Sequence, residues 1–178
     1  MTGIALVRID DRLIHGQVVV KWLRYVECDE VLIVDDQLAQ DSFMQTVLRL
    51  AAPPEVPVRV VAGGEAPGKL AAAGAGGRRT MILLKAPQTA LALLNDGVAF
   101  SELNVGGLAS GPRTRRLYKS VSASAEQIAA LREIAARGVR VYFQMVPEDR
   151  PVEMADVLRS GALASQAAHA AHSARGVG

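Results

Sequence analysis

Apolar residues along the chain alternate between short runs typical of strands and longer segments with helical spacing. Runs rich in Val, Ile and Leu predict strands over residues 4–9, 31–34, 56–62, 80–84, 103–105, 117–122 and 139–146. Between them, apolar residues recur every three or four positions and predict helices over residues 16–26, 42–52, 69–75, 87–94 and 124–138. Strands separated by helices of this length form βαβ units, so we expect an α/β fold with a mostly parallel sheet and helices on both faces.

The C-terminal half departs from this alternation. Residues 117–122 follow the preceding strand with no room for a crossover helix, so we expect one antiparallel strand there. Ser124 and Gln127 have the spacing of a capping box at the start of the last helix. The length of 178 residues fits one domain, which we place at residues 1–160, and the Ala-rich residues 161–178 are expected to form a flexible tail.

Composition and charge exclude several classes of protein. Half of the residues are apolar and 21% are charged, which indicates a folded chain. The single Cys excludes an internal disulfide framework and a multi-Cys zinc site. A net charge of +2 with 4% aromatic residues does not favour a nucleic-acid-binding protein. Because the sequence contains neither a signal-peptide pattern nor a run of about 20 apolar residues, we expect a cytoplasmic protein without membrane insertion.

The segment after the first predicted strand is dense in groups that can perform chemistry. Ligands of open α/β sheets bind beyond the carboxyl ends of the strands, and His15 lies there, in the turn that leads into a helix. The free N–H groups at the start of a helix bind anions, and Arg12 and Arg8 could add guanidinium donors for phosphoryl oxygens. The segment therefore has the parts of a phosphohistidine site, although an isolated His in a turn is more often a surface residue.

Neighbouring residues could support such a site. Asp10 or Asp11 could accept a hydrogen bond from one imidazole nitrogen of His15 and leave the other as a nucleophile. Gly16 allows a positive φ angle and a close approach of the backbone to the phosphoryl group. The simpler interpretation of Asp10 is a helix cap.

Two further pairs follow later strands. Asp35 and Asp36 form a carboxylate pair after the second strand, and we expect them to cap the next helix. Gly106 and Gly107 end the fifth predicted strand and are typical of a turn, with approach to a ligand as the second possibility.

The remaining charged clusters carry weaker signals. Arg113, Arg115 and Arg116 are expected to form a solvated basic loop, with contact to phosphate or a partner as the alternative. His169 and His172 lie in the Ala-rich tail with no third ligand nearby. We therefore expect neither a metal site nor a cofactor.

The segment from Val7 to Val18 carries a resemblance to a known family. Its sequence, Val-Arg-Ile-Asp-Asp-Arg-Leu-Ile-His-Gly-Gln-Val, closely resembles the phosphorylation-site signature of the IIB components of the mannose/fructose/sorbose family of the bacterial sugar phosphotransferase system. The run Asn104-Val105-Gly106-Gly107 is similar to a second motif of that family. The resemblance covers about residues 3–158.

The resemblance implies an α/β domain with a sheet of about seven strands, and it implies a function. His15 would accept a phosphoryl group from the phosphorylated IIA component and pass it to a sugar bound by the membrane IIC and IID components. The chain would then be the IIB subunit of a protein-phosphohistidine–sugar phosphotransferase, cytoplasmic and peripheral to the inner face of the membrane when docked on the permease.

The same resemblance assigns roles to the residues around His15. Arg12 would bind the phosphoryl group and Asp10 would orient the imidazole ring, with a weaker contribution from Arg8. Gly106 and Gly107 would line the rim of the site.

Two other functions stay open at this point. The domain could be a regulatory phosphocarrier that signals the state of the phosphotransferase system without a permease of its own. It could also be a small-molecule-binding α/β domain in which His15 only binds an anion.

Overall fold

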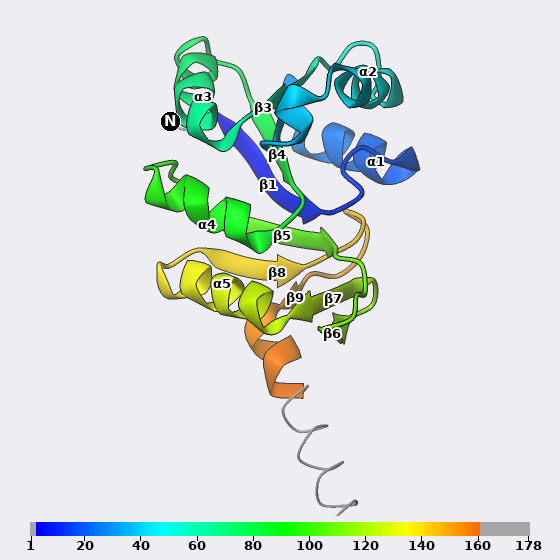
Figure 1. Ribbon diagram of the computed structural model, residues 1–178, viewed down its shortest axis with the longest axis vertical. Coiled ribbons are helices and arrows are strands. Elements are labelled where there is room, and N and C mark those ends of the chain that lie inside the picture. The colour runs from blue at the N-terminus through cyan, green and yellow to red at the C-terminus, as the bar shows by residue number, and fades with distance from the viewer. Residues whose placement is uncertain (1–2, 161–178) are drawn as a thin grey trace, which may run out of the picture.

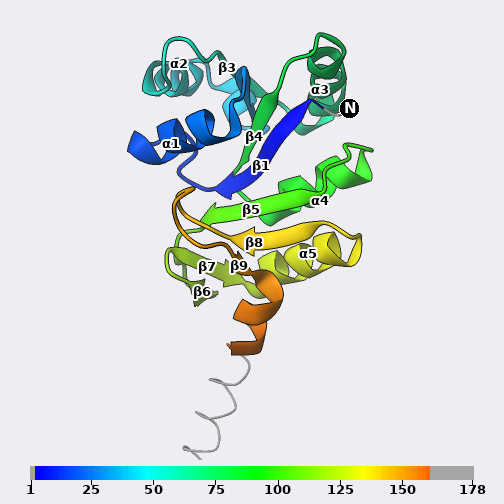
Figure 2. The same cartoon turned by 180° about the vertical axis from the view of Figure 1, so that it is seen from behind.

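The computed structural model describes residues 3–160, which form a seven-stranded sheet with helices on both faces and a separate hairpin (Figures 1 and 2). The strands are β1 (Ile4–Asp10), β2 (Glu30–Val34), β3 (Val58–Val61), β4 (Thr80–Leu84), β5 (Glu102–Gly107), β6 (Thr114–Tyr118), β7 (Val121–Ser124), β8 (Arg140–Phe143) and β9 (Val152–Glu153). The helices are α1 (Gly16–Val26), α2 (Ser42–Ala51), α3 (Ala66–Ala75), α4 (Pro87–Asn95) and α5 (Ala125–Ala136), and residues 154–160 are also helical. Short 3-10 turns cover Leu38–Gln40 and Gly63–Glu65.

The order of the strands creates a topological switch point between β1 and β5. The order is β3-β2-β4-β1-β5-β8-β9, and all neighbours are parallel except β9, which is antiparallel to β8. The predicted mostly parallel sheet is therefore confirmed. The chain leaves β1 toward β2 on one side and leaves β5 toward β8 on the other, so their carboxyl ends form a topological switch point, where open α/β sheets bind ligands.

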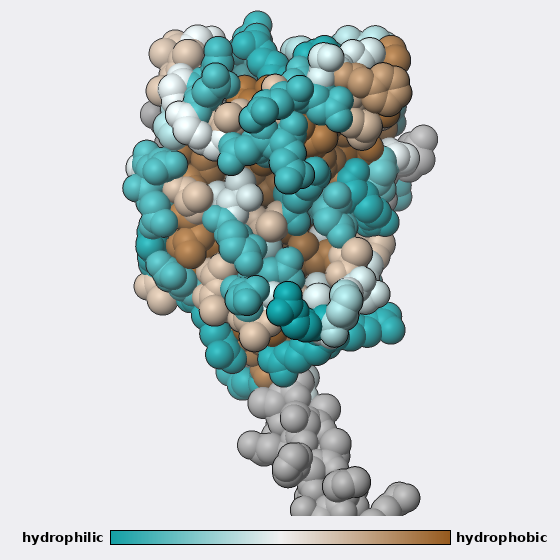
Figure 3. Space-filling model, viewed as in Figure 1, coloured by the Kyte–Doolittle hydropathy of each residue, from teal (hydrophilic) through white to brown (hydrophobic). Residues whose placement is uncertain are grey.

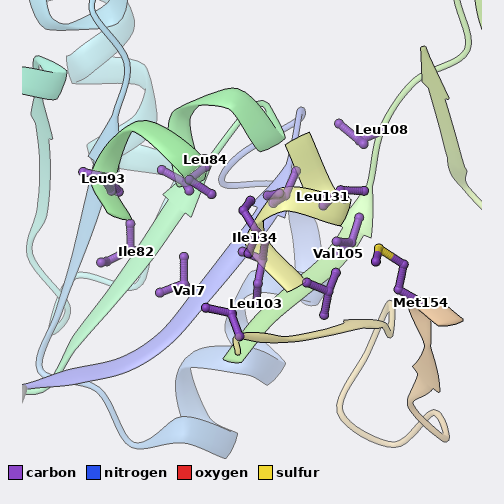
Figure 4. Packing of buried hydrophobic residues seen from close by; sticks show 14 of the residues in the cluster. Val7, Ile82, Leu84, Leu93, Leu103, Val105, Leu108, Leu131, Ile134 and Met154 are labelled. Atoms are coloured by element: carbon purple, nitrogen blue, oxygen red, sulfur yellow. The ribbon is translucent and has the colours of Figure 1, made fainter. Parts of the chain in front are cut away.

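The sheet is buried on both faces by two separate cores. On β1, Val7 and Ile9 belong to the core that α4 and α5 cover, whereas Leu6 belongs to the core that α1 and α2 cover. Figure 4 shows part of the first core, with Val7 beside Leu103 and the α5 residues Leu131 and Ile134. Strands buried on both faces favour apolar residues at nearly every position, and β2 and β4 are apolar runs after their first residues, Glu30 and Thr80.

The C-terminal half differs from the prediction in its strands. Residues 117–122 do not form one strand of the main sheet, because a turn at Lys119, with φ of 32°, folds this segment into the separate hairpin of β6 and β7. The antiparallel strand of the main sheet is β9 instead. The strand predicted over residues 139–146 ends at Phe143, because the side-chain amide of Gln144 donates to the carbonyls of Pro147 and Asp149 and holds a loop there.

Two other boundaries also move. Strand β5 continues through Gly106 and Gly107 instead of ending before them. Helix α3 begins at Ala66 rather than at residue 69, with a proline in its first turn, where the missing N–H costs nothing. Residues 161–178 lie outside the described part of the chain, so the flexible tail and the domain boundary at residue 160 stay predictions.

The surface carries one apolar helix face. Phe43, Val47 and Leu50 are exposed on α2 and contribute to the hydrophobic surface over that helix in Figure 3. In the described part of the chain, every helix is too short or too polar to cross a membrane.

Candidate functional site

The carboxyl ends of β1 and β5 lie side by side and carry the polar residues of the candidate site. The strand register pairs Arg8 with Asn104 and Asp10 with Gly107. In Figure 1 the arrowheads of β1 and β5 point to the same edge of the sheet, where the turn to α1 begins. The turn ends at His15, so the structure brings the predicted site residues of both strands to the switch point.

Apolar side chains fix the turn between β1 and α1. Leu13 and Ile14 are buried in the core beneath α1 and α2, and the Leu13 N–H donates to the Asp10 carbonyl at 2.9 Å. Leu13 has φ of 56° and Gly16 has φ of 46°, so two left-handed residues flank the end of the turn. A non-glycine residue in this region is strained, and the burial of Leu13 offsets that cost. As a result, His15 is held at the N-cap of α1 in extended conformation.

Arg8 is a buried cation whose two Nη atoms make four hydrogen bonds. Its side chain is 2% exposed and lies over the ring of Trp22, with 5.2 Å from Cζ to the ring centroid. Nη1 donates to the Asn104 side-chain oxygen and to the Gln144 carbonyl, and Nη2 donates to Asp10 and to the Met145 carbonyl. Burial lowers the pKa of Arg8, against the opposing effect of the Asp10 carboxylate. The guanidinium therefore links β1, β5 and the loop after β8.

Asp10 stands at the centre of the site. It is 1% exposed and accepts from Arg8 Nη2 at 2.9 Å and from Arg12 Nε at 3.1 Å, and His15 Nε2 lies 3.2 Å from its Oδ2. Burial by itself would raise the pKa of Asp10, but the hydrogen bond from Arg12, the charge of Arg8 and the hydrogen bond from His15 hold it below its usual value. The carboxylate is therefore ionised and can only accept hydrogen bonds.

The geometry defines the state of the His15 ring. Because the Asp10 carboxylate can only accept, the neutral ring must carry its proton on Nε2, which leaves the lone pair on Nδ1. The imidazole is 23% exposed, whereas Asp10 is almost fully covered. His15 is accessible to another molecule while its orienting carboxylate is not.

The surroundings of His15 favour an anion. Among the described residues, the N-cap residue His15 makes no side-chain capping hydrogen bond to α1, and the first turn holds no acidic residue, so its N–H groups and the helix dipole favour an anion. The Arg12 side chain, 49% exposed, shares Asp10 with His15 and uses Nε and Nη2 for that contact. Its other N–H groups are unused there. A phosphoryl group on His15 would meet positive electrostatics from both sources.

The two glycines of β5 make room for the charged side chains. A Cβ atom at Gly106 would lie 1.9 Å from Arg8 Nη2, and one at Gly107 would lie 2.9 Å from Asp10 Oδ1 and 3.1 Å from Arg12 Nη2. Gly107 thus borders Asp10 and Arg12 directly, while Gly106 lies against the buried guanidinium. That these glycines line the rim of the phosphoryl site stays a prediction. The packing explains why both positions hold glycine, because a side chain there would overlap the charged groups of β1 and its turn.

Several residues that hold the site were not recognised from the sequence. Asn104 had been noted only as part of a motif, and Gln144, Met145 and Trp22 had no assigned role. The Trp22 Nε1–H donates to the Met145 carbonyl at 2.9 Å, and Asn104 Nδ2 donates to the Gln144 carbonyl at 3.2 Å. One available signal is Gln144, which interrupts the apolar residues 141–146.

The carboxylate pair after β2 does not join the site. Asp35 Oδ1 accepts from the Leu38 N–H at 2.8 Å in a short 3-10 turn, and Asp36 Oδ1 accepts from the Gly63 N–H at 2.8 Å in another loop. The prediction that they cap the next helix is wrong, because Asp41 caps α2 by accepting from the Met44 N–H at 2.9 Å. Of the tail, residues 169 and 172 lie outside the described residues.

Comparisons with known proteins identify the family to which the chain is similar. The family model described as PTS system sorbose subfamily IIB component matches residues 4–169, which extends past the predicted boundary at residue 160. The PTS system fructose-specific EIIB component of Bacillus subtilis (strain 168) is 30% identical over 160 residues, covering 90% of this chain and 98% of that protein. The PTS system mannose-specific EIIAB component of Escherichia coli (strain K12) is 32% identical over 155 residues, covering 87% of this chain and 48% of that protein.

A solved structure shares the fold. The crystal structure of the IIBSor domain of the sorbose permease from Klebsiella pneumoniae matches with a TM-score of 0.84 and 34% identity. The match covers 88% of this chain and 96% of that chain.

Proposed function

Since the chain belongs to the sorbose subfamily of IIB components of the sugar phosphotransferase system, we propose that His15 is its phosphoryl carrier. The proposed donor is the phosphorylated IIA component, and the proposed acceptor is a sugar bound by the membrane IIC and IID components. The observation that carries the proposal is the exposed His15 ring, held through Nε2 by the buried Asp10 at the uncapped N-terminus of α1.

In the proposed first step, the Nδ1 lone pair of His15 attacks phosphorus in line. The bond between phosphorus and the donor imidazole breaks as the bond to Nδ1 forms, and the donor ring leaves as neutral imidazole. His15 then carries a phosphoryl group on Nδ1 and its proton on Nε2, so the ring gains a positive charge. The ionised Asp10, 3.2 Å from Nε2, stabilises this charge and fixes the tautomer beforehand.

Phosphoryl transfer depends mainly on positioning and on stabilisation of charge on the equatorial oxygens. The free N–H groups of Arg12 and of the first turn of α1 would supply that stabilisation. Arg8 acts indirectly. One of its hydrogen bonds goes to Asp10, and the other three hold the guanidinium that positions this carboxylate. The Asp10 carboxylate and the guanidinium groups of Arg8 and Arg12 have a net charge of +1. This charge attracts the phosphoryl dianion without fully neutralising it, so the group can still be transferred to the acceptor.

In the second step, a sugar hydroxyl attacks the phosphorus and the bond to Nδ1 breaks. The ring returns to the neutral tautomer with its proton on Nε2, and the hydroxyl proton leaves to a base of the permease or to water. The exposure of His15 at the end of the sheet lets two different proteins reach it in turn. We therefore propose that the chain docks at the inner face of the membrane during transfer.

A phosphorylation assay tests the proposal. The protein is incubated with phosphoenolpyruvate, the general phosphotransferase proteins and candidate IIA proteins, and intact mass is measured at neutral pH. We expect one acid-labile phosphoryl group per chain, absent in His15→Ala. The double variant His169→Ala/His172→Ala is the matched control and should be phosphorylated like the wild type. A His15→Ala protein that still accepts the phosphoryl group would disprove the assignment.

A further inference from the structure

A cavity of about 360 Å³ lies between the β6–β7 hairpin and α5, away from the residues of the transfer site. Three arginines line it: Arg113 and Arg115 from the hairpin side and Arg132 from α5. Figure 1 shows the hairpin beside the N-terminal end of α5. Its lining includes none of the residues assigned to phosphoryl transfer.

The local geometry explains why these three side chains converge. Arg115 belongs to β6, and Arg113 lies in the turn just before it, which the Thr114 N–H closes by donating to the Gly111 carbonyl at 3.1 Å; both line the cavity. Arg116 leaves the opposite side of β6 from Arg115, and its Nε donates to the Lys119 carbonyl at 2.9 Å. Arg132 lies one helical turn after Ile128 on α5 and faces the same cavity. The basic cluster expected from the sequence is therefore divided, and Arg132 takes the place of Arg116.

The three arginines have no counter-charge. Throughout residues 3–160, none of them lies within ion-pair distance of a carboxylate, and no acidic residue lines the cavity. Neighbouring arginines behave differently, since Arg137 pairs with Glu133 at 2.6 Å on the same helix. Convergent guanidinium groups without a partner repel one another, and an anion between them would remove that repulsion.

The remaining walls of the cavity point to the kind of anion. The buried Ala123 and Ile128 and the exposed Ala129 give it an apolar floor. Planar guanidinium groups bind phosphate oxygens in pairs. The volume is within the usual range for small-molecule sites, about 300–1,000 Å³.

We propose that this cavity is a second anion site, which binds a small phosphorylated metabolite. The phosphate group lies among the guanidinium groups of Arg113, Arg115 and Arg132, and the carbon skeleton of the metabolite packs on the floor formed by Ala123, Ile128 and Ala129. The site is separate from His15, so it does not depend on the proposed phosphocarrier function, and either can fail without the other.

Two hydrogen bonds connect the segments that flank the hairpin turn with residues next to the phosphoryl-transfer site. The Ala109 N–H, in the segment between β5 and β6, donates to the Asp11 carboxylate at 2.7 Å, and the Ser120 hydroxyl donates to the Gly106 carbonyl at 3.1 Å. A ligand that holds the hairpin against α5 therefore also acts on the segment beside Asp10.

NMR titration of the full chain tests the proposal, with inorganic phosphate, glucose 6-phosphate and glucose as probes. With glucose 6-phosphate we expect saturable shifts of the backbone amides of residues 113–115 and 125–129, weaker binding of inorganic phosphate and no response to glucose. Arg115→Gln should weaken the binding at least about tenfold, the loss expected for one charge-assisted hydrogen bond. Arg116→Gln removes the same charge from the opposite side of β6 and should change the affinity less than twofold.

A second variant removes the space instead of the charge. Ala129 is exposed on α5, so Ala129→Glu keeps the helix, fills the cavity and adds a negative charge; binding should be lost while the circular dichroism spectrum is unchanged. Three results would overturn the proposal: shifts confined to residues 11–16, equal weakening by Arg115→Gln and Arg116→Gln, or a response only to an acidic partner protein.

Discussion

Replacing Arg8 by Met should destabilise the protein far more than the loss of an exposed arginine. Arg8→Met keeps an unbranched side chain as far as the position of Nε but removes the guanidinium, which is 2% exposed, lies over Trp22 and makes four hydrogen bonds. Removing one partner of a buried ion pair costs about 3–5 kcal/mol, because the other charge stays buried without compensation. Here that charge is Asp10.

Of the other partners of Arg8, only the side-chain oxygen of the buried Asn104 loses its recorded donor, and the rest keep a hydrogen bond. The Met145 carbonyl keeps its hydrogen bond from Trp22, and the Gln144 carbonyl keeps its hydrogen bond from Asn104. Asp10 also keeps Arg12 and His15. We therefore expect the free energy of unfolding to fall by about 3–5 kcal/mol, without further additive penalties for unpaired backbone groups.

Urea unfolding monitored by the fluorescence of Trp22, the single Trp of the chain, measures this loss. Arg12→Met is the matched control: Arg12 binds the same carboxylate but is half exposed, so its loss should cost less than about 1 kcal/mol. The double variant Arg8→Met/Asp10→Asn should be less destabilised than the sum of the two single variants. An Arg8→Met protein within about 1 kcal/mol of the wild type would refute the reasoning that this ion pair organises the site.

Three further predictions concern the same residues. The pKa of Asp10 in the folded protein lies below its unfolded value of about 3.9, so the stability that its charge contributes is present above that pH and is lost as the pH falls toward the folded pKa. Urea unfolding at a series of acidic pH values should therefore show a shrinking stability difference between the wild type and Asp10→Asn. A constant difference would contradict the pKa shift. Gly106→Ala should cost about 1–3 kcal/mol in the same assay because its Cβ would overlap Arg8, whereas Gly111→Ala, with its nearest neighbour at 3.8 Å, should cost less; similar losses would count against the packing argument. Arg12→Gln should slow phosphorylation about 10²–10³-fold in rapid-quench experiments with unchanged stability, and an unchanged rate would remove Arg12 from the phosphoryl site.

The sequence predicted the elements best where both faces of the sheet bury apolar side chains. Strand β4 has the predicted bounds of residues 80–84, because residues 81–84 alternate between the two cores. The sequence does not predict the hairpin at residues 114–124, because β6 is half exposed, β7 has only four residues and the turn between them lacks glycine. Local periodicity does not encode the contact between β6 and α5 that builds the arginine cavity.

The sequence predicts those residues of the candidate site that are close together in the chain. Asp10, Arg12 and His15 lie within six positions, and the motif placed them in one turn. The residues that hold Arg8 could not be predicted in this way, because Asn104 and Gln144 are 96 and 136 positions away along the chain. Their contribution follows from the register of β1 against β5 and from the loop after β8.

The position of the phosphoryl group on the His15 ring tests the central claim most directly. The protein, labelled with ¹⁵N and phosphorylated by its IIA partner, is studied by long-range ¹H–¹⁵N correlation spectra of the imidazole and by ³¹P spectra. We predict a phosphoryl group on Nδ1 of His15, with the proton on Nε2 hydrogen-bonded to Asp10. A phosphoryl group on Nε2, or on any other residue, would contradict the role of Asp10 as the group that orients the ring.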